Sequence, residues 1–76
     1  MVIGVTMVNV MPGSEKTTYV EIKKMKNVRD IYHVFGEFDF VVIIEASSLS
    51  ELNKTVDDIR AIEGVTKTQT VVGAEI

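Results

Sequence analysis

The stretch FDFVVIIEASSLSELNKTVDDIRAIEGV, residues 38–65, contains the two best-marked elements of this sequence. Its first part, Phe40 through Ala46, is a short apolar run that is typical of a strand buried on both faces. Ser48 and Glu51 then form a capping box, and apolar residues follow at helical spacing, namely Leu49, Leu52, Val56 and Ile59. Gly64 stands where a glycine commonly ends a helix. The pattern therefore predicts a buried strand followed directly by an amphipathic helix.

The segments on either side predict four further elements. Residues 1–10 are apolar on both alternating parities, which indicates another strand with two buried faces. After the break MPGS, with Ser14 as the predicted N-cap, residues 15–26 carry apolar side chains at three-residue spacing and predict a helix, at Tyr19, Ile22 and Met25. Residues 28–35 and the connection GEFD predict a β-hairpin, and residues 65–72 a closing strand. The order is β-α-β-β-α-β in one domain, residues 1–76.

This order predicts an α+β fold of the ferredoxin-like kind, because right-handed crossovers place both helices on one face of a four-stranded antiparallel sheet. The two strands that are apolar on both parities are then the central ones. One parity of residues 40–46 remains uncovered, together with either Ile3, Val5 and Met7 or the opposite parity. A contiguous apolar surface of this kind is unusual for a soluble monomer. We expect a homodimer with the sheets packed face to face; a bound cofactor on that face is the lesser alternative.

Composition excludes several classes of protein. The chain has 76 residues, of which 46% are hydrophobic and 25% charged, with no cysteine, a single histidine and a net charge of −3. Disulfides, thiolate catalysis and cysteine-rich metal sites are therefore excluded, and no metal or cofactor is expected. The negative charge disfavours direct binding of nucleic acid, and the apolar runs are too short to cross a bilayer. We expect a cytoplasmic protein without a catalytic residue.

The loop GEFD, residues 36–39, permits two interpretations. Gly36 permits a positive φ, and the Asp39 carboxylate can accept backbone N–H groups, so the loop can be a plain hairpin turn. Alternatively, Asp39 accepts the ammonium group of a free amino acid while N–H groups of the Gly36 turn donate to its carboxylate. Thr68 and Thr70 also permit two interpretations. Threonine suits an edge strand, and two hydroxyls on one face can also bind the head group of an amino acid.

The segment NVRDIYHVFGEFDFVVIIEASSLSELNKTVDDIRAIEGVTKTQTVV, residues 27–72, resembles the effector-binding domain of the Lrp/AsnC family. The resemblance rests on G-x-[FY]-D, the apolar strand after it, the helix near SSLSEL, and I-x-G-V-x-x-T-x-T-x-V. It implies that an amino-acid effector binds between dimers, against that loop and the threonine-bearing last strand. The matching positions are Gly36, Glu37, Phe38, Asp39, Thr68 and Thr70.

The resemblance also implies partners. Members of the family form dimers and higher oligomers, so an assembly of four to eight chains is expected. A helix-turn-helix domain usually precedes this one in the family, whereas residue 1 here already begins the first strand. We therefore expect a stand-alone sensor domain, with mixed assembly with a DNA-binding relative as a further possibility.

Two other functions remain open on the sequence alone. The first is an enzyme of the dimeric α+β-barrel type that uses His33 in the space between two sheets. The second is an amino-acid-binding regulator of the ACT kind, which has the same order of elements. Its ligand loop would lie between the first strand and the first helix, where NVMPGSEK is a weak match. A partly buried, structural His33 is the preferred interpretation.

Overall fold

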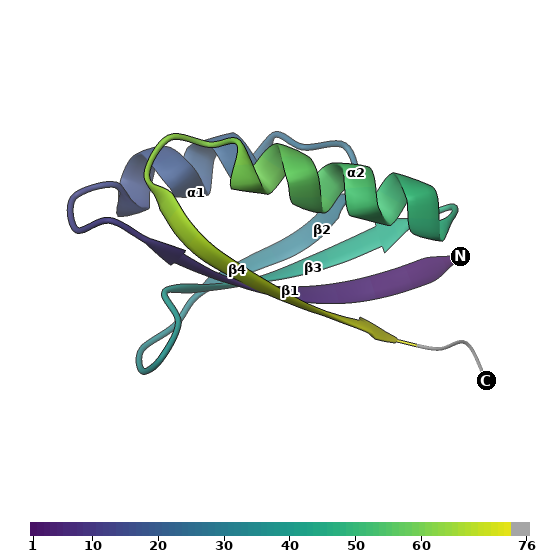
Figure 1. The fold of residues 1–76 in the computed structure, drawn as a ribbon, viewed down its shortest axis with the longest axis horizontal. Helices are drawn as coiled ribbons and strands as arrows, with labels where there is room; N and C mark the ends of the chain where they lie inside the picture. The colour runs from purple at the N-terminus through teal and green to yellow at the C-terminus, as the bar shows by residue number, and fades with distance from the viewer. Residues whose placement is uncertain (74–76) are drawn as a thin grey trace.

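The computed structural model describes residues 1–73 and has the predicted β-α-β-β-α-β order. The strands are β1 (Val2–Val10), β2 (Val28–His33), β3 (Phe40–Ala46) and β4 (Val65–Gly73); the helices are α1 (Glu15–Lys23) and α2 (Leu49–Arg60). All four strands form one antiparallel sheet in the order β2-β3-β1-β4. Both helices cover the same face of the sheet (Figure 1). The predicted fold and its central strands, β1 and β3, are confirmed.

The core lies between the helices and one parity of the central strands. Along β3, Phe40, Val42, Ile44 and Ala46 are buried, while the residues between them are half-exposed. In β1 the buried parity is Gly4, Thr6, Val8 and Val10. Gly4 lets β1 and α2 approach closely there, because a Cβ atom at its position would lie 2.8 Å from the Leu52 Cδ1 of α2 and the Leu52 side chain would have to shift. The uncovered face therefore carries Ile3, Val5 and Met7, the first of the two alternatives that the sequence left open.

Helix α2 begins as predicted, since the Ser48 hydroxyl accepts the N–H of Glu51 at 3.2 Å. Three of its apolar residues are buried in the core, and the fourth, Leu49, is 52% exposed because it lies in the first turn, at the end of the sheet. The helix ends at Arg60, so the prediction that Gly64 caps it was wrong. Gly64, with φ +102°, instead lies in the turn that leads into β4, and its carbonyl accepts the N–H of Met11 at 2.8 Å.

Helix α1 and strand β2 are both shorter than predicted. α1 ends at Lys23, so Met25 lies beyond it, and the Ser14 side chain makes no capping hydrogen bond. β2 ends at His33, and its pairing with β3 shifts register between Val28 and Asp30. The connection from β2 to β3 projects past the end of the sheet, away from the helices (Figure 1). In the described part of the chain, no helix is long and apolar enough to span a membrane.

Candidate functional site

The tip of the β2–β3 connection is exposed and open. Gly36 has φ +122°, a left-handed conformation that favours glycine, and a Cβ atom there would meet no atom within 4 Å. Glu37 is also exposed. Phe35, just before this tip, is 96% exposed. Backbone geometry therefore accounts for the glycine, whereas Glu37 and Phe35 are largely exposed to solvent.

Asp39 fixes this connection to the end of β1. Its Oδ2 accepts the N–H of Val10 at 2.8 Å, at the point where the β1–β4 pairing shifts register. Its own N–H donates to the Val8 carbonyl at 3.0 Å and to the Asn9 Oδ1 at 3.1 Å, and its carbonyl accepts the N–H of Val34 at 2.9 Å. The half-buried carboxylate therefore has a structural function, and its position is fixed by several backbone hydrogen bonds.

Phe38 connects the same loop to the far edge of the sheet. The Lys67 Nζ of β4 lies 5.8 Å from the centroid of the Phe38 ring, within the range of a cation–π contact. Lys67 pairs with Asn9 across β1 and β4. The loop thus places an aromatic ring beside the first residues of β4, while its carboxylate is bound to β1.

Thr68 and Thr70 both lie on the helix-covered side of β4. Their register partners are Val8 and Thr6, whose side chains are buried under the helices. The Thr70 hydroxyl forms a hydrogen bond of 2.9 Å with the Thr6 hydroxyl. Thr68 lines a hollow of about 370 Å³ whose other lining residues are Arg60, Val65, Thr66 and Lys67. Arg60 and the two threonines offer donors at this hollow, whereas the Lys67 ammonium lies over the Phe38 ring.

Within one chain, the two halves of the sequence-predicted site do not meet. Asp39 continues the β3 side of the sheet, β1 lies between, and Thr68 is on β4. Two interstrand spacings, about 10 Å, therefore separate their backbones. The ammonium and carboxylate groups of an α-amino acid are attached to a single carbon atom. One chain therefore does not bring Asp39 and Thr68 to the same head group.

His33 lies on the helix-covered side of the sheet. Its register partner is the buried Phe40, and the two ring centroids are 5.0 Å apart; the exposed Phe35 ring lies at 5.7 Å. The imidazole itself is exposed, so the prediction of a partly buried histidine was wrong. The packing contact with Phe40 is present, but the uncovered face of the sheet is on the other side.

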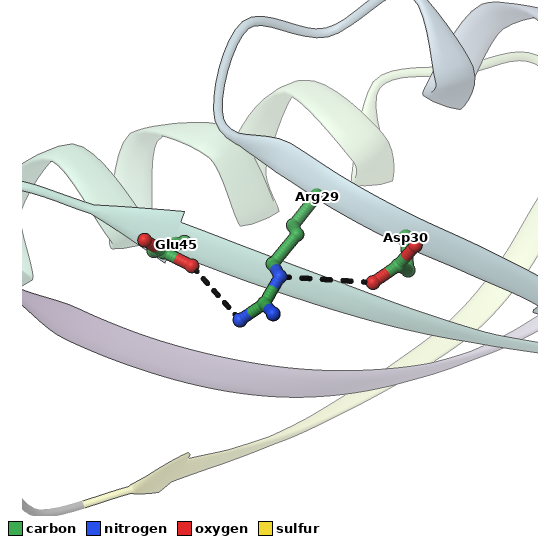
Figure 2. Close-up of polar contacts among 3 residues, drawn as sticks. All are labelled: Arg29, Asp30 and Glu45. Atoms are coloured by element: carbon green, nitrogen blue, oxygen red, sulfur yellow. Dashed lines mark hydrogen bonds and ion pairs between the residues drawn. The ribbon is translucent and has the colours of Figure 1, made fainter.

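A second polar group lies at the opposite end of β2 (Figure 2). The Arg29 Nη1 lies 3.1 Å from the Glu45 Oε2, and its Nε lies 3.8 Å from the Asp30 Oδ2. Arg29 and Glu45 also line an open hollow of about 470 Å³ with Lys26, Asn27 and Val28. Glu45 pairs with Ile3, so this ion group borders the uncovered face.

Sequence reasoning missed three residues beside the candidate site. Asn9 accepts the N–H of Asp39, Lys67 contacts Phe38, and Arg60 at the end of α2 lines the hollow with Thr68. Alternation along β1 and β4 places Asn9 and Lys67 on the same side of the sheet only once the pairing register of the two strands is known. That register depends on the shift at Asn9/Val10, which no sequence pattern indicates.

The β-α-β-β-α-β order, with both helices on one face of a four-stranded antiparallel sheet, is that of the ferredoxin-like fold. The model of the Lrp/AsnC ligand binding domain matches residues 2–74. The chain therefore belongs to the Lrp/AsnC family. It is 33% identical over 52 residues to the HTH-type transcriptional regulator LysM of Sulfurisphaera tokodaii, which covers 68% of this chain and 37% of LysM.

Solved structures agree in fold. FFRP-DM1 superposes with a TM-score of 0.92 at 25% identity, over 97% of this chain and 100% of the other. The transcriptional regulator NMB0573 of Neisseria meningitidis, in its complex with L-Met, superposes with a TM-score of 0.84 at 14% identity, over 97% of this chain and 50% of the other. This chain spans little more than a third of LysM, so it corresponds to only one part of such a regulator.

Proposed function

We propose that this chain is a non-catalytic regulatory domain that binds a free amino acid and acts as a homo-oligomer. The observation that carries the proposal is the fixed Asp39 carboxylate. Oδ2 is hydrogen-bonded to the Val10 N–H, while among residues 1–73 the Oδ1 atom has no hydrogen-bond partner. A carboxylate has about four acceptor sites, so the bond to Val10 leaves capacity for an ammonium group.

The carboxylate of the same ligand requires donors or cations. The hollow with Thr68 and Arg60 supplies both, but about 10 Å of sheet separates it from Asp39 of the same chain. Two chains that place the loop of one beside the β4 hollow of the other remove this separation. This geometry supports binding between dimers, with Gly36, Glu37, Phe38 and Asp39 on one side and Thr68 and Thr70 on the other. NMB0573, a structural relative, was solved with L-Met.

The dimer is proposed from the uncovered face of the sheet. By register, one side of the strands carries the apolar residues Ile3, Val5, Met7, Val41, Ile43 and Val71, all half-exposed or exposed. Burying this surface against the same face of a second copy removes it from water. The Arg29–Glu45 ion pair at its border fits the polar rim of a protein interface.

The enzyme alternative needs His33 in the space between two such faces. Because His33 lies on the helix-covered side, the proposed dimer does not enclose it. Relatives named as transcriptional regulators favour a regulatory function as well. We propose that the domain works in the cytoplasm, where mixed assembly with a DNA-binding relative would transmit the signal.

A thermal-shift screen of the twenty amino acids, followed by calorimetry on the best one, tests the proposal. Asp39→Asn keeps an oxygen for the Val10 N–H but removes the charge that binds ammonium. A hydrogen bond to a charged group contributes about 1.5–3 kcal/mol, so we expect affinity to fall roughly 10- to 150-fold. Asp58→Asn, an exposed change on α2 with the same effect on net charge, should leave affinity unchanged. Unchanged affinity in Asp39→Asn would return the loop to a purely structural function.

A further inference from the structure

The open hollow of about 470 Å³ lies where the chain passes from α1 into β2. Three of its lining side chains are charged, Lys26, Arg29 and Glu45, and the other two lining residues are Asn27 and Val28. Two positive charges and one negative charge sum to +1. The volume is within the range of small-ligand sites. The proposed function gives this hollow no ligand.

The backbone at this hollow is held from two sides. The Asn27 carbonyl accepts the N–H of Glu45 in β3 at 2.9 Å, and the Asn27 Nδ2 donates to the buried Thr55 Oγ1 of α2 at 3.0 Å. The Val28 N–H donates to the Met25 carbonyl at 3.2 Å. A ligand therefore does not have to order this segment, which lowers the cost of binding.

Arg29 is directed into the group by an irregularity of the sheet. The pairing advances from Val28 to Asp30 along β2 while it advances by one residue along β3, so Arg29 has no register partner. Bulges of this kind re-aim side chains and are common beside functional sites. Here the guanidinium points toward Glu45, with Nη1 3.1 Å from Oε2 (Figure 2). The bulge thus places a cation and an anion side by side.

The charged groups keep binding capacity beyond this ion pair. Of the five N–H donors of Arg29, one donates to the Glu45 Oε2. Among residues 1–73, the Glu45 Oε1 has no hydrogen-bond partner and the Lys26 Nζ has no ion pair. The Glu45 side chain is 30% exposed, so water screens it only in part. The hollow therefore offers two cationic groups and one anionic group to a ligand.

We propose that this hollow binds an acidic amino acid, L-aspartate or L-glutamate, within a single chain. The ammonium and α-carboxylate groups are attached to one carbon atom and match the adjacent Glu45 and Arg29. The distal carboxylate binds the Lys26 ammonium, which a flexible stem carries. A neutral amino acid leaves Lys26 unmatched, and a simple dicarboxylate adds negative charge beside Glu45. The acidic amino acid meets all three charges.

This site does not rest on the proposed function. Asp39 and Thr68 are about 10 Å apart in one chain and need a second chain to meet, whereas Arg29 and Glu45 already meet. The pair borders the uncovered face, and the rim of a protein interface stays accessible to solvent.

Calorimetry with L-aspartate and L-glutamate tests the site. Lys26→Met and Glu45→Gln should each weaken the tighter of the two roughly five- to tenfold, because each removes one charged contact at a partly exposed position. Lys24→Met is the matched control, because Lys24 is exposed and lies outside the lining. Failure of both ligands to bind would overturn the proposal, as would equal losses in Lys24→Met and Lys26→Met.

Ligand analogues assign the contacts one at a time. Succinate and glutarate lack the ammonium group, so Glu45→Gln should not weaken their binding. L-Asparagine and L-glutamine lack the distal carboxylate, so Lys26→Met should not weaken theirs. Losses as large for these analogues as for the acidic amino acids would refute the assigned contacts.

Asp39→Asn separates this site from the one proposed between dimers. If Asp39→Asn weakens the acidic amino acid while Glu45→Gln does not, the inference drawn here is wrong and the proposed function stands. The reverse result would support the hollow and count against Asp39 as the ammonium acceptor.

Discussion

The two faces of the sheet are built from the same strands but differ in what covers them. On one face, Val8, Val42 and Ile44 are fully buried beneath the helices. On the other, Ile3 is 39% and Val71 is 55% exposed. Both faces are equally apolar in sequence, so hydrophobicity alone does not distinguish the surface buried within the chain from that available to a second chain. Folding of one chain covers one face, and the other is the face on which we propose that a second chain packs.

The largest effect is expected on the covered face. Ile44→Ala removes a buried side chain beneath the helices, and large-to-small changes of this kind cost about 2–5 kcal/mol. Urea denaturation should show this loss of unfolding free energy. Val20→Ala, at an exposed position of α1, should change stability by less than about 0.5 kcal/mol. A loss below about 1 kcal/mol at Ile44 would contradict the account of this face as the core.

The neighbouring residue tests the other face. Ile43→Glu puts a carboxylate among apolar side chains that the proposed dimer buries without water, a costly arrangement for an unpaired charge. We expect the dimer dissociation constant to rise at least about 100-fold, equivalent to about 2.7 kcal/mol. Sedimentation velocity at low micromolar concentration measures it. Asn53→Glu, on the exposed side of α2, is the control. An Ile43→Glu variant that sediments like the unmodified protein would remove this face as the interface.

Sequence patterns predicted the element order and the central strands, because a strand buried on both faces must be apolar on both parities. Because both parities are apolar, the sequence does not show which parity faces the helices. One close approach on the helix-covered side, between Gly4 and Leu52, joins residues far apart in the chain: a Cβ atom at Gly4 would lie 2.8 Å from the Leu52 Cδ1. Likewise, the early end of α1 at Lys23 was unpredictable, since Lys24, Met25 and Lys26, which follow it, are good helix formers.

The residues proposed for the site could be identified in the sequence, but their relative positions in space could not. The loop GEFD and the threonine strand are visible in the sequence, and their role in binding stays a prediction. The hydrogen bond from the Val10 N–H to Asp39, 29 positions apart, has no local signature. The separation of Asp39 from Thr68 by β1 follows only from the sheet order. Tertiary pairing, not local propensity, determines both features.

The smallest expected effect concerns a polar atom on the covered side. The Thr18 Oγ1 of α1 is buried and has no hydrogen-bond partner in the described structure. Such an unpaired hydroxyl is destabilising, and valine has nearly the same shape without it. Thr18→Val should therefore raise the free energy of unfolding by about 1 kcal/mol. In urea denaturation, the midpoint should increase while the slope stays constant.

The same substitution at Thr55 is the matched control, and its effect should have the opposite sign. The buried Thr55 hydroxyl accepts a hydrogen bond from the Asn27 Nδ2 at 3.0 Å and donates one to the Glu51 carbonyl at 3.0 Å. Thr55→Val leaves the Asn27 amide without this partner, which should lower stability by about 1–2 kcal/mol. If both variants shift the urea midpoint in the same direction, the hydrogen bonding of the two hydroxyls does not determine the result. Opposite shifts would show that the hydrogen bonding of each hydroxyl determines how its removal changes the free energy of unfolding.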